Sequence, residues 1–102
     1  MRWSREEIQV LVTLFHNSLF SVGDDEREEC KLIAEAFNRT PSAVDRQWRN
    51  IADVKHKKTD LRVTKLIPQC LVEYLDDPKA YKKLCVLICK QRGWNLTGIM
   101  RE

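Results

Sequence analysis

The sequence predicts an all-α protein with five helices in one domain. Glycine and proline each occur only three times in 102 residues, and several segments repeat apolar residues at spacings of three and four, which is the period of an amphipathic helix. Capping residues precede these segments, as expected at helix starts. Hydrophobic residues make up 43% of the chain and charged residues 32%, which indicates a folded domain with a modest core and argues against disorder.

The first helix is expected to begin at Ser4 and to end near Ser21, before Gly23. The letters SREE match a capping box, in which the Ser4 hydroxyl accepts a hydrogen bond from a free amide and Glu7 reaches back to another. Its inward-facing residues are then Ile8, Leu11, Val12, Phe15 and Leu19.

The second helix is expected to begin at Asp24 or Asp25. The letters DDEREE place five carboxylates where the helix dipole is positive and where backbone amides need acceptors. Asn38 follows at the position where a helix often closes in a left-handed conformation, which asparagine tolerates. The predicted buried stripe consists of Cys30, Ile33, Ala34 and Phe37.

The third helix is expected to run from about Pro41 to Val54. Thr40 is a suitable N-cap, and proline at the first helical position loses no hydrogen bond, because its missing amide would have been unpaired. At about 100° per residue, one side of this helix is apolar and the other polar. The apolar side carries Val44, Trp48 and Ile51; the polar side carries Ser42, Arg46, Arg49 and Asp53, with Asp45 and Asn50 at the flanks.

Trp48 lies on the apolar side of this helix. We therefore expect it to be buried, against Phe15 and Phe37, and not to serve as a platform for nucleic-acid bases. In that position it would join the first three helices where they cross.

The fourth helix is expected from about Val63 to Leu75, and Pro68 lies inside it. Because proline in a helix interior removes a hydrogen bond, either the helix begins only at Pro68 or the residues before it form a separate short turn. The predicted buried residues are Leu66, Ile67, Cys70, Leu71 and Tyr74.

The fifth helix has a clear start and end. Asp77 is its N-cap, Pro78 takes the first position, and the helix should end at Arg92 before Gly93. Its predicted stripe is Tyr81, Leu84, Cys85 and Ile88, with Cys89 as a further candidate.

The four cysteines are expected to be core thiols. Cys85 and Cys89 are four residues apart in an apolar stretch and share a helix face, and the chain has neither a CxxC nor an HxxxH motif. A zinc site or a disulfide is the alternative. His16 and His56 stand alone, and no catalytic arrangement or phosphate-binding glycine loop occurs, so we expect no enzymatic activity, no cofactor and no metal.

The second and third helices, joined by a turn of about three residues, match a helix-turn-helix, which places its second helix in the DNA major groove. Between residues 39 and 65, eight basic residues face three acids, a balance of +5, whereas the whole chain carries +3. We expect residues 1–60 to form the helix-turn-helix module and residues 61–102 a helical extension packed on it. The residues predicted to contact double-stranded DNA are Arg39, Thr40, Ser42, Arg46, Arg49, Asn50, Lys55, Lys57 and Lys58.

Residues 32–51, LIAEAFNRTPSAVDRQWRNI, resemble the second and third helices of the Myb/SANT-like, homeodomain-like group. They are most similar to the small DNA-binding domain found ahead of HNH nucleases in bacterial and phage proteins. The opening RWSREEIQVLVTLF resembles the first helix of that group, with Trp3 at its aromatic position. The resemblance implies duplex DNA as the partner. Myb repeats carry three regularly spaced tryptophans, whereas this segment has only Trp3 and Trp48, and no HNH-like histidines follow residue 60.

Two functions remain open: a DNA-binding protein, such as a small regulator or phage accessory factor, and a protein-protein interaction module on the same fold. The letters LCVLIC make residues 78–92 a candidate surface for a homodimer or a protein partner, unless the last two helices bury these residues within the chain. The N-terminus lacks an apolar signal core, and no apolar run approaches the roughly 18 residues that span a bilayer. We therefore expect no membrane contact and a cytoplasmic, nucleoid-associated location, or a nuclear one in a eukaryote.

Overall fold

Five α-helices make up most of the chain that the structure describes. The structure is a computed structural model, and it describes residues 2–17, 28–56 and 66–96. Within these ranges it contains no strand, which confirms the all-α prediction. The helices are α1 (Arg5–Asn17), α2 (Glu28–Phe37), α3 (Pro41–Lys55), α4 (Leu66–Asp76) and α5 (Pro78–Arg92).

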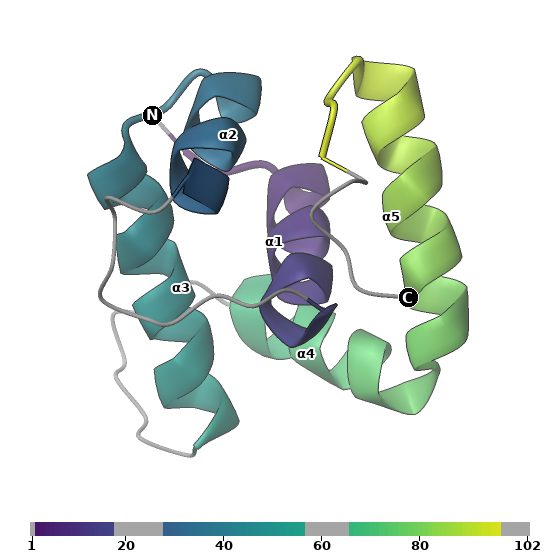
Figure 1. Ribbon diagram of the computed structural model, residues 1–102. Coiled ribbons are helices and arrows are strands. Elements are labelled where there is room, and N and C mark those ends of the chain that lie inside the picture. Colours follow the sequence, from purple (N-terminus) through teal and green to yellow (C-terminus); the bar gives the residue numbers. More distant parts are fainter. Residues whose placement is uncertain (1, 18–27, 57–65, 97–102) are drawn as a thin grey trace.

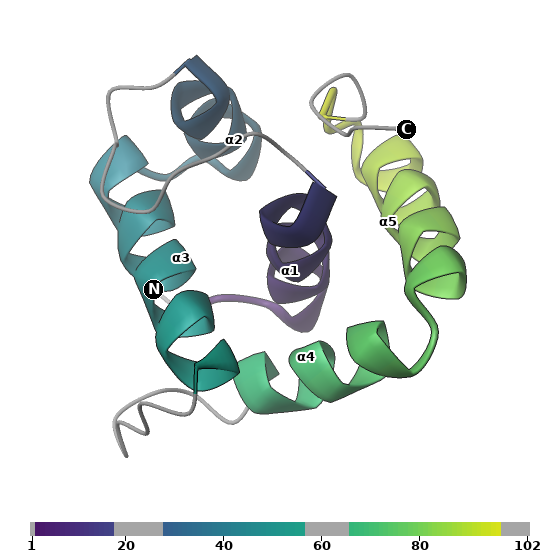
Figure 2. The same cartoon turned by 60° about the horizontal axis from the view of Figure 1, so that its bottom comes forward.

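Helix α1 lies at the centre of the fold (Figure 1). Seen from below, α3, α4 and α5 follow one another around it in an open arc, with α2 above α3 (Figure 2). α1 packs against α3, α4 and α5, and α2 packs mainly against α3. Because α4 and α5 pack directly on α1, residues on both sides of residue 60 contribute to one core.

The helix starts follow the capping signals in the sequence. The Ser4 Oγ accepts a hydrogen bond from the Glu7 amide at 3.1 Å, and the Ser4 amide donates to the Glu7 Oε1 at 2.9 Å, so the capping box is confirmed. Thr40 caps α3 by accepting from the Ala43 amide at 3.1 Å. Asp77 caps α5 in the same way.

Two helix ends also match the predictions. Asn38 follows α2 with a φ of 56°, in the left-handed region, and Gly93 closes α5 with a φ of 73°. The Gly93 conformation is one that residues with a side chain rarely adopt, which explains why glycine ends this helix. The predicted start of the second helix at Asp24 or Asp25, and the predicted end of the first near Ser21, lie outside the described residues.

Helix α4 corrects one expectation. It begins at Leu66, two residues before Pro68, so both alternatives are wrong: the helix does not begin only at Pro68, and Leu66 and Ile67 do not form a separate turn. The expected start near Val63 lies outside the described residues. Pro68 falls within the first turn of the helix, where backbone amides have no partner inside the helix. The missing amide of proline therefore costs no hydrogen bond at this position.

The core consists of apolar residues from all five helices. The predicted stripe of α2 is buried, as are Val44, Trp48 and Ile51 of α3. Three residues predicted to be buried are only partly buried against this core: Phe15, Leu66 and Leu84. Leu19 lies outside the described residues. All four cysteines are buried thiols, which confirms their prediction as core residues.

The aromatic residues in the described ranges form two groups. Trp48 is 2% exposed, and its ring lies 6.1 Å from that of Phe15 between centroids, so its predicted burial and its contact with Phe15 are confirmed. Phe37, which was expected beside Trp48, meets Trp3 edge-on at 6.0 Å and Trp94 at 4.6 Å. Trp94 follows α5, so this second group joins α2 to the end of α5.

His16 packs against Tyr74 at the end of α1 and has a lowered pKa. Its Nδ1 lies 2.7 Å from the Val12 carbonyl oxygen, and its ring stacks on Tyr74 at 4.2 Å. Its Nε2 is buried without a hydrogen-bond partner in the part of the chain described. Burial lowers the pKa of His16, and the charge of Lys55 lowers it further, against the opposing effect of the Val12 carbonyl.

Because the folded-state pKa is depressed, His16 favours folding above its unfolded pKa of about 6.5, and this contribution is lost as the pH falls through the folded value. We expect urea unfolding to show lower stability at about pH 5.5 than at about pH 7.5. The His16→Gln variant should show a shallower decline over that range. An equally steep decline in the variant would assign the pH dependence to other groups.

Candidate nucleic-acid interface

Helix α3 has one buried face and one exposed face. Val44, Trp48 and Ile51 are buried in the core, whereas Ser42, Arg46 and Arg49 are exposed on the opposite side. The alternation arises from the sequence itself, because residues at i, i+4 and i+7 share a side of a helix. The structure therefore brings these three predicted contact residues together on one surface.

The two arginines on this surface differ in their surroundings. The Arg49 Nε lies 3.0 Å from the Asp45 Oδ2, and the side chain of Arg49 is 58% exposed while that of Asp45 is 12% exposed. Asp45, expected at the flank of the helix, is thus close to the core. Its carboxylate contacts the guanidinium of Arg49 and restricts where that side chain can lie. Arg46 is exposed and makes no ion pair within the described residues.

The flanks of the surface are polar. The Asn50 Nδ2 donates to the Gln47 Oε1 at 3.2 Å, and Asn50 is half-buried. At the far end of α3, Lys55 is exposed, and its Nζ lies 5.6 Å from the centre of the Phe15 ring. Lys57 and Lys58 lie outside the described residues, so their place relative to this surface stays a prediction.

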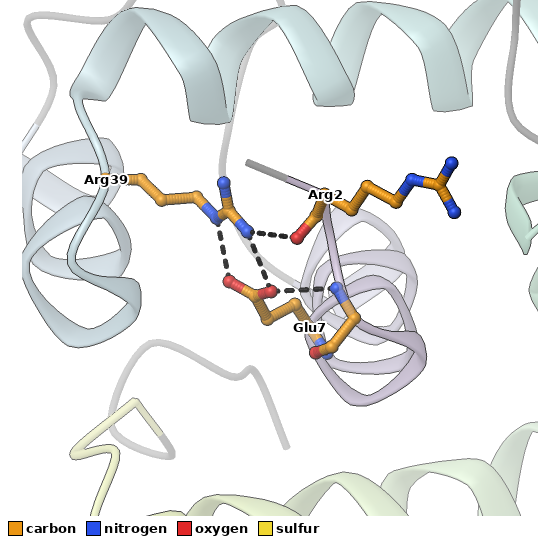
Figure 3. A network of polar contacts seen from close by, with 4 residues as sticks. Arg2, Glu7 and Arg39 are labelled. Carbon is orange, nitrogen blue, oxygen red and sulfur yellow. Dashed lines mark hydrogen bonds and ion pairs between the residues drawn. The ribbon is translucent and has the colours of Figure 1, made fainter.

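Arg39 belongs to the turn between α2 and α3, and its side chain joins a polar network with Glu7 and Arg2 (Figure 3). Its Nε donates to the Glu7 Oε2 at 2.8 Å, and its Nη2 donates to the Glu7 Oε1 and to the Arg2 carbonyl oxygen, both at 3.0 Å. Its guanidinium also lies over the Trp3 ring, 4.0 Å from the centroid. Arg39 therefore fastens the turn before α3 to the start of α1.

The charges in this network stabilise each other. Burial would raise the pKa of Glu7, but the hydrogen bonds from Arg39 and from Ser4 outweigh it and hold the pKa below its ordinary value. The hydrogen bond to Glu7 in turn raises the pKa of Arg39. The guanidinium and the carboxylate form a two-point contact that suits their planar shapes. Arg39 was predicted to contact DNA, but its Nε and Nη2 are engaged within the chain by Glu7 and by the Arg2 carbonyl oxygen.

Two further ion pairs start at the first turn of α1. Arg5 contacts Glu73 of α4, and Glu6 contacts Arg92 of α5. Glu7 contacts Arg39, as described above. The three successive residues 5, 6 and 7 therefore join α1 to α4, to α5 and to the turn before α3, respectively. Nothing in the sequence links these partners, because each pair brings together residues far apart in the chain.

A group of metal ligands and a helix able to cross a membrane are two further arrangements to consider in the described part of the chain. There, no group of three or more His, Cys, Asp or Glu side chains is arranged to hold a metal ion. Among the same residues, every helix is too short or too polar to cross a membrane.

Comparison with known proteins adds no further assignment. No protein-family model matches the chain, and no curated protein or solved structure is significantly similar to it. A functional conclusion therefore depends on the surface of α3 and its surroundings.

Proposed function

We propose that the protein binds double-stranded DNA by placing the exposed face of α3 in the major groove. The observation that carries this proposal is the pair Arg46 and Arg49 on a helix whose opposite face is anchored in the core. An α-helix is about 10 to 12 Å across with its side chains, which matches the roughly 12 Å width of the major groove. The proposed activity is binding without catalysis.

The surroundings of α3 support this orientation. A short turn at residues 38–40 connects it to α2, and α2 packs on it. The Arg39 contact to Glu7 fixes this turn against α1, so α3 is held from both its N-terminal end and its buried face. A rigid support matters because hydrogen bonds to base edges require close positioning. The resemblance to Myb/SANT-like domains points to the same arrangement.

Each polar residue has a proposed role. Arg46 and Arg49 carry planar groups that match the paired acceptors of guanine and also phosphate oxygens. Ser42 lies at the N-terminal end of the face, and Asn50 lies at its edge. Thr40 keeps its capping role, because its side chain already accepts a hydrogen bond from the helix. A role as a small regulator or phage accessory factor is compatible with such binding.

Alanine substitutions on α3 test the groove assignment. We expect Arg46→Ala and Arg49→Ala each to weaken specific binding by about 1 to 3 kcal/mol and to relax the preference at one base position. Fluorescence anisotropy would measure both effects, with a duplex selected for binding from random sequences and with single-base variants of that duplex. Arg46 is exposed and makes no ion pair among the described residues, so Arg46→Ala should change the unfolding temperature little. The unfolding temperature of Arg49→Ala separates a loss of binding from the loss of the contact with Asp45. Specific binding equal to the parent in both variants would exclude this face from the groove.

Lys55, the last residue of α3, is proposed to contact phosphates together with Lys57 and Lys58, which follow it in the sequence. Replacing Lys55, Lys57 and Lys58 with alanine should weaken binding to all duplex sequences alike. The slope of log affinity against log salt should flatten by about 0.9 for each phosphate that is no longer neutralised, since fewer counterions are released. Anisotropy titrations at several salt concentrations give this slope. A slope identical to that of the parent would place all three lysines in solvent.

A second candidate function is binding to another protein. It is favoured by the aliphatic side chains exposed on α4 and α5, which include Val72, Leu75, Val86 and Leu87. A gel-shift series with random and genomic duplex DNA at two salt concentrations separates the two functions. Salt-sensitive binding supports the DNA proposal, and no binding at the lower salt concentration would leave the protein-binding function.

A further inference from the structure

Helix α5 exposes a face that combines lysines with aliphatic residues. Lys83, Val86, Leu87 and Lys90 are all exposed and lie at i, i+3, i+4 and i+7, on one side of the helix. Leu87 is 52% exposed and Val86 45%. α5 carries five basic residues and no acid. We call these four residues the basic face of α5.

Helix α4 exposes a face of the opposite charge. Val72, Leu75 and Asp76 are exposed, and the two aliphatic side chains are 68% and 60% exposed. α4 has two acids and no basic residue. Glu73 is paired with Arg5 of α1, so Asp76, with the exposed Asp77 next to it, carries the negative charge of this face. Beside Val72, a shallow hollow of about 410 Å³ is lined by Pro68, Gln69, Val72 and Glu73. We call Val72, Leu75 and Asp76, with this hollow, the acidic face of α4.

The two faces cannot cover each other within one molecule. Both helices turn their inner sides toward α1, where residues such as Cys70 and Tyr74 of α4 and Cys85 and Ile88 of α5 are buried. α4 and α5 lie along different sides of α1 (Figure 2). The exposed faces therefore point outward and away from α1.

We propose that the acidic face of α4 binds the basic face of α5 of a second copy of this chain. The faces match in two ways. Both expose aliphatic side chains, and Leu87 of one copy enters the hollow beside Val72 of the other. In addition, the lysines of the basic face pair with Asp76. Duplex DNA matches the basic face less well, because two exposed aliphatic side chains at its centre would lie against phosphates. Two basic faces, or two acidic faces, would repel each other.

The contact joins two different patches, so it is heterologous and generates a ring or a chain of copies instead of a twofold dimer. It involves one helix face on each side and is therefore small. Interfaces of this size belong to weak, transient associations. We expect self-association at high micromolar concentration, weakened by added salt, and independent of DNA.

Sedimentation velocity of the full chain over a range of concentrations tests this proposal. The variants are Val72→Lys, which disables the acidic face, and Leu87→Lys, which disables the basic face. Leu32→Lys is the matched control, since Leu32 is an exposed aliphatic residue on α2, outside both faces. Circular dichroism confirms that each variant is folded.

The parent and Leu32→Lys should show sedimentation coefficients that rise with concentration, whereas Val72→Lys and Leu87→Lys should each abolish this rise. The decisive sample is an equimolar mixture of the two defective variants. Each retains the face that the other lacks, so the mixture should form a one-to-one dimer and stop there. A mixture that stays monomeric would overturn the proposal, as would a parent that is monomeric at every concentration or a loss of association in only one variant.

Discussion

Replacing Trp48 with alanine is expected to lower the free energy of unfolding by about 3 to 5 kcal/mol. The side chain is 2% exposed, and it packs beside Phe15 while its neighbours Val44 and Ile51 are fully buried. The substitution removes a large apolar surface from the core and leaves a cavity where α3 faces α1. Small domains are stable by only about 5 to 15 kcal/mol, so the loss is a large share of the total.

Urea unfolding followed by circular dichroism measures this effect. Trp94→Ala is the matched control, because Trp94 is only partly buried and lies near the end of the described chain. We expect a smaller loss for Trp94→Ala than for Trp48→Ala. Equal stability of the Trp48→Ala variant and the parent would show that Trp48 does not anchor α3, and the buried face assigned to that helix would then be wrong.

Replacing Arg39 with methionine is expected to cost about 3 kcal/mol of stability, because it leaves the Glu7 carboxylate close to the core without its partner. Both side chains are only about a tenth exposed, at 11% for Arg39 and 10% for Glu7. Removing both charges in Glu7→Gln/Arg39→Met should cost less than the sum of the single substitutions, since no charge is then left unpaired. Urea unfolding of the four proteins completes the cycle.

The matched control for this cycle is Arg5→Met, which breaks the exposed pair with Glu73. Exposed pairs contribute about 0 to 1 kcal/mol, so a small effect is expected. Equal losses in Arg39→Met and Arg5→Met would contradict the fastening role of Arg39.

Glu7 is also expected to make the stability depend on pH. Its folded pKa is below the ordinary value, so its contribution to the free energy of unfolding is present above the unfolded pKa and is lost as the pH falls through the folded value.

The helices were predictable because their signals are local. The capping box at Ser4, the cap at Thr40 and the pair Asp77 and Pro78 each act within a few residues. The buried face of α3 was predictable for the same reason, since helical spacing alone separates Trp48 from Arg46. The place of Pro68 within α4 was not predictable. The first turn of a helix can hold proline, and the sequence did not show where that turn begins.

The part of the candidate site that could not be predicted depends on contacts between distant residues. Arg39 belongs to a basic segment in the sequence, and only the packing of α1 beside the turn reveals that it pairs with Glu7. The exposed aliphatic residues of α4 were missed for a similar reason. Helical spacing placed Val72 and Leu75 off the expected buried stripe, but only the fold shows that they stay exposed.

The most direct test of the central claim is the affinity for duplex DNA of the double variant Arg46→Ala/Arg49→Ala. The matched control is Lys79→Ala/Lys82→Ala, which removes the same charge from positions on α5 outside its basic face. Anisotropy titrations at low and moderate salt should show salt-dependent binding by the parent and the control, and strongly reduced binding by the α3 variant. Equal weakening in both double variants, or no binding by the parent at low salt, would contradict the assignment of α3 as the DNA-binding helix.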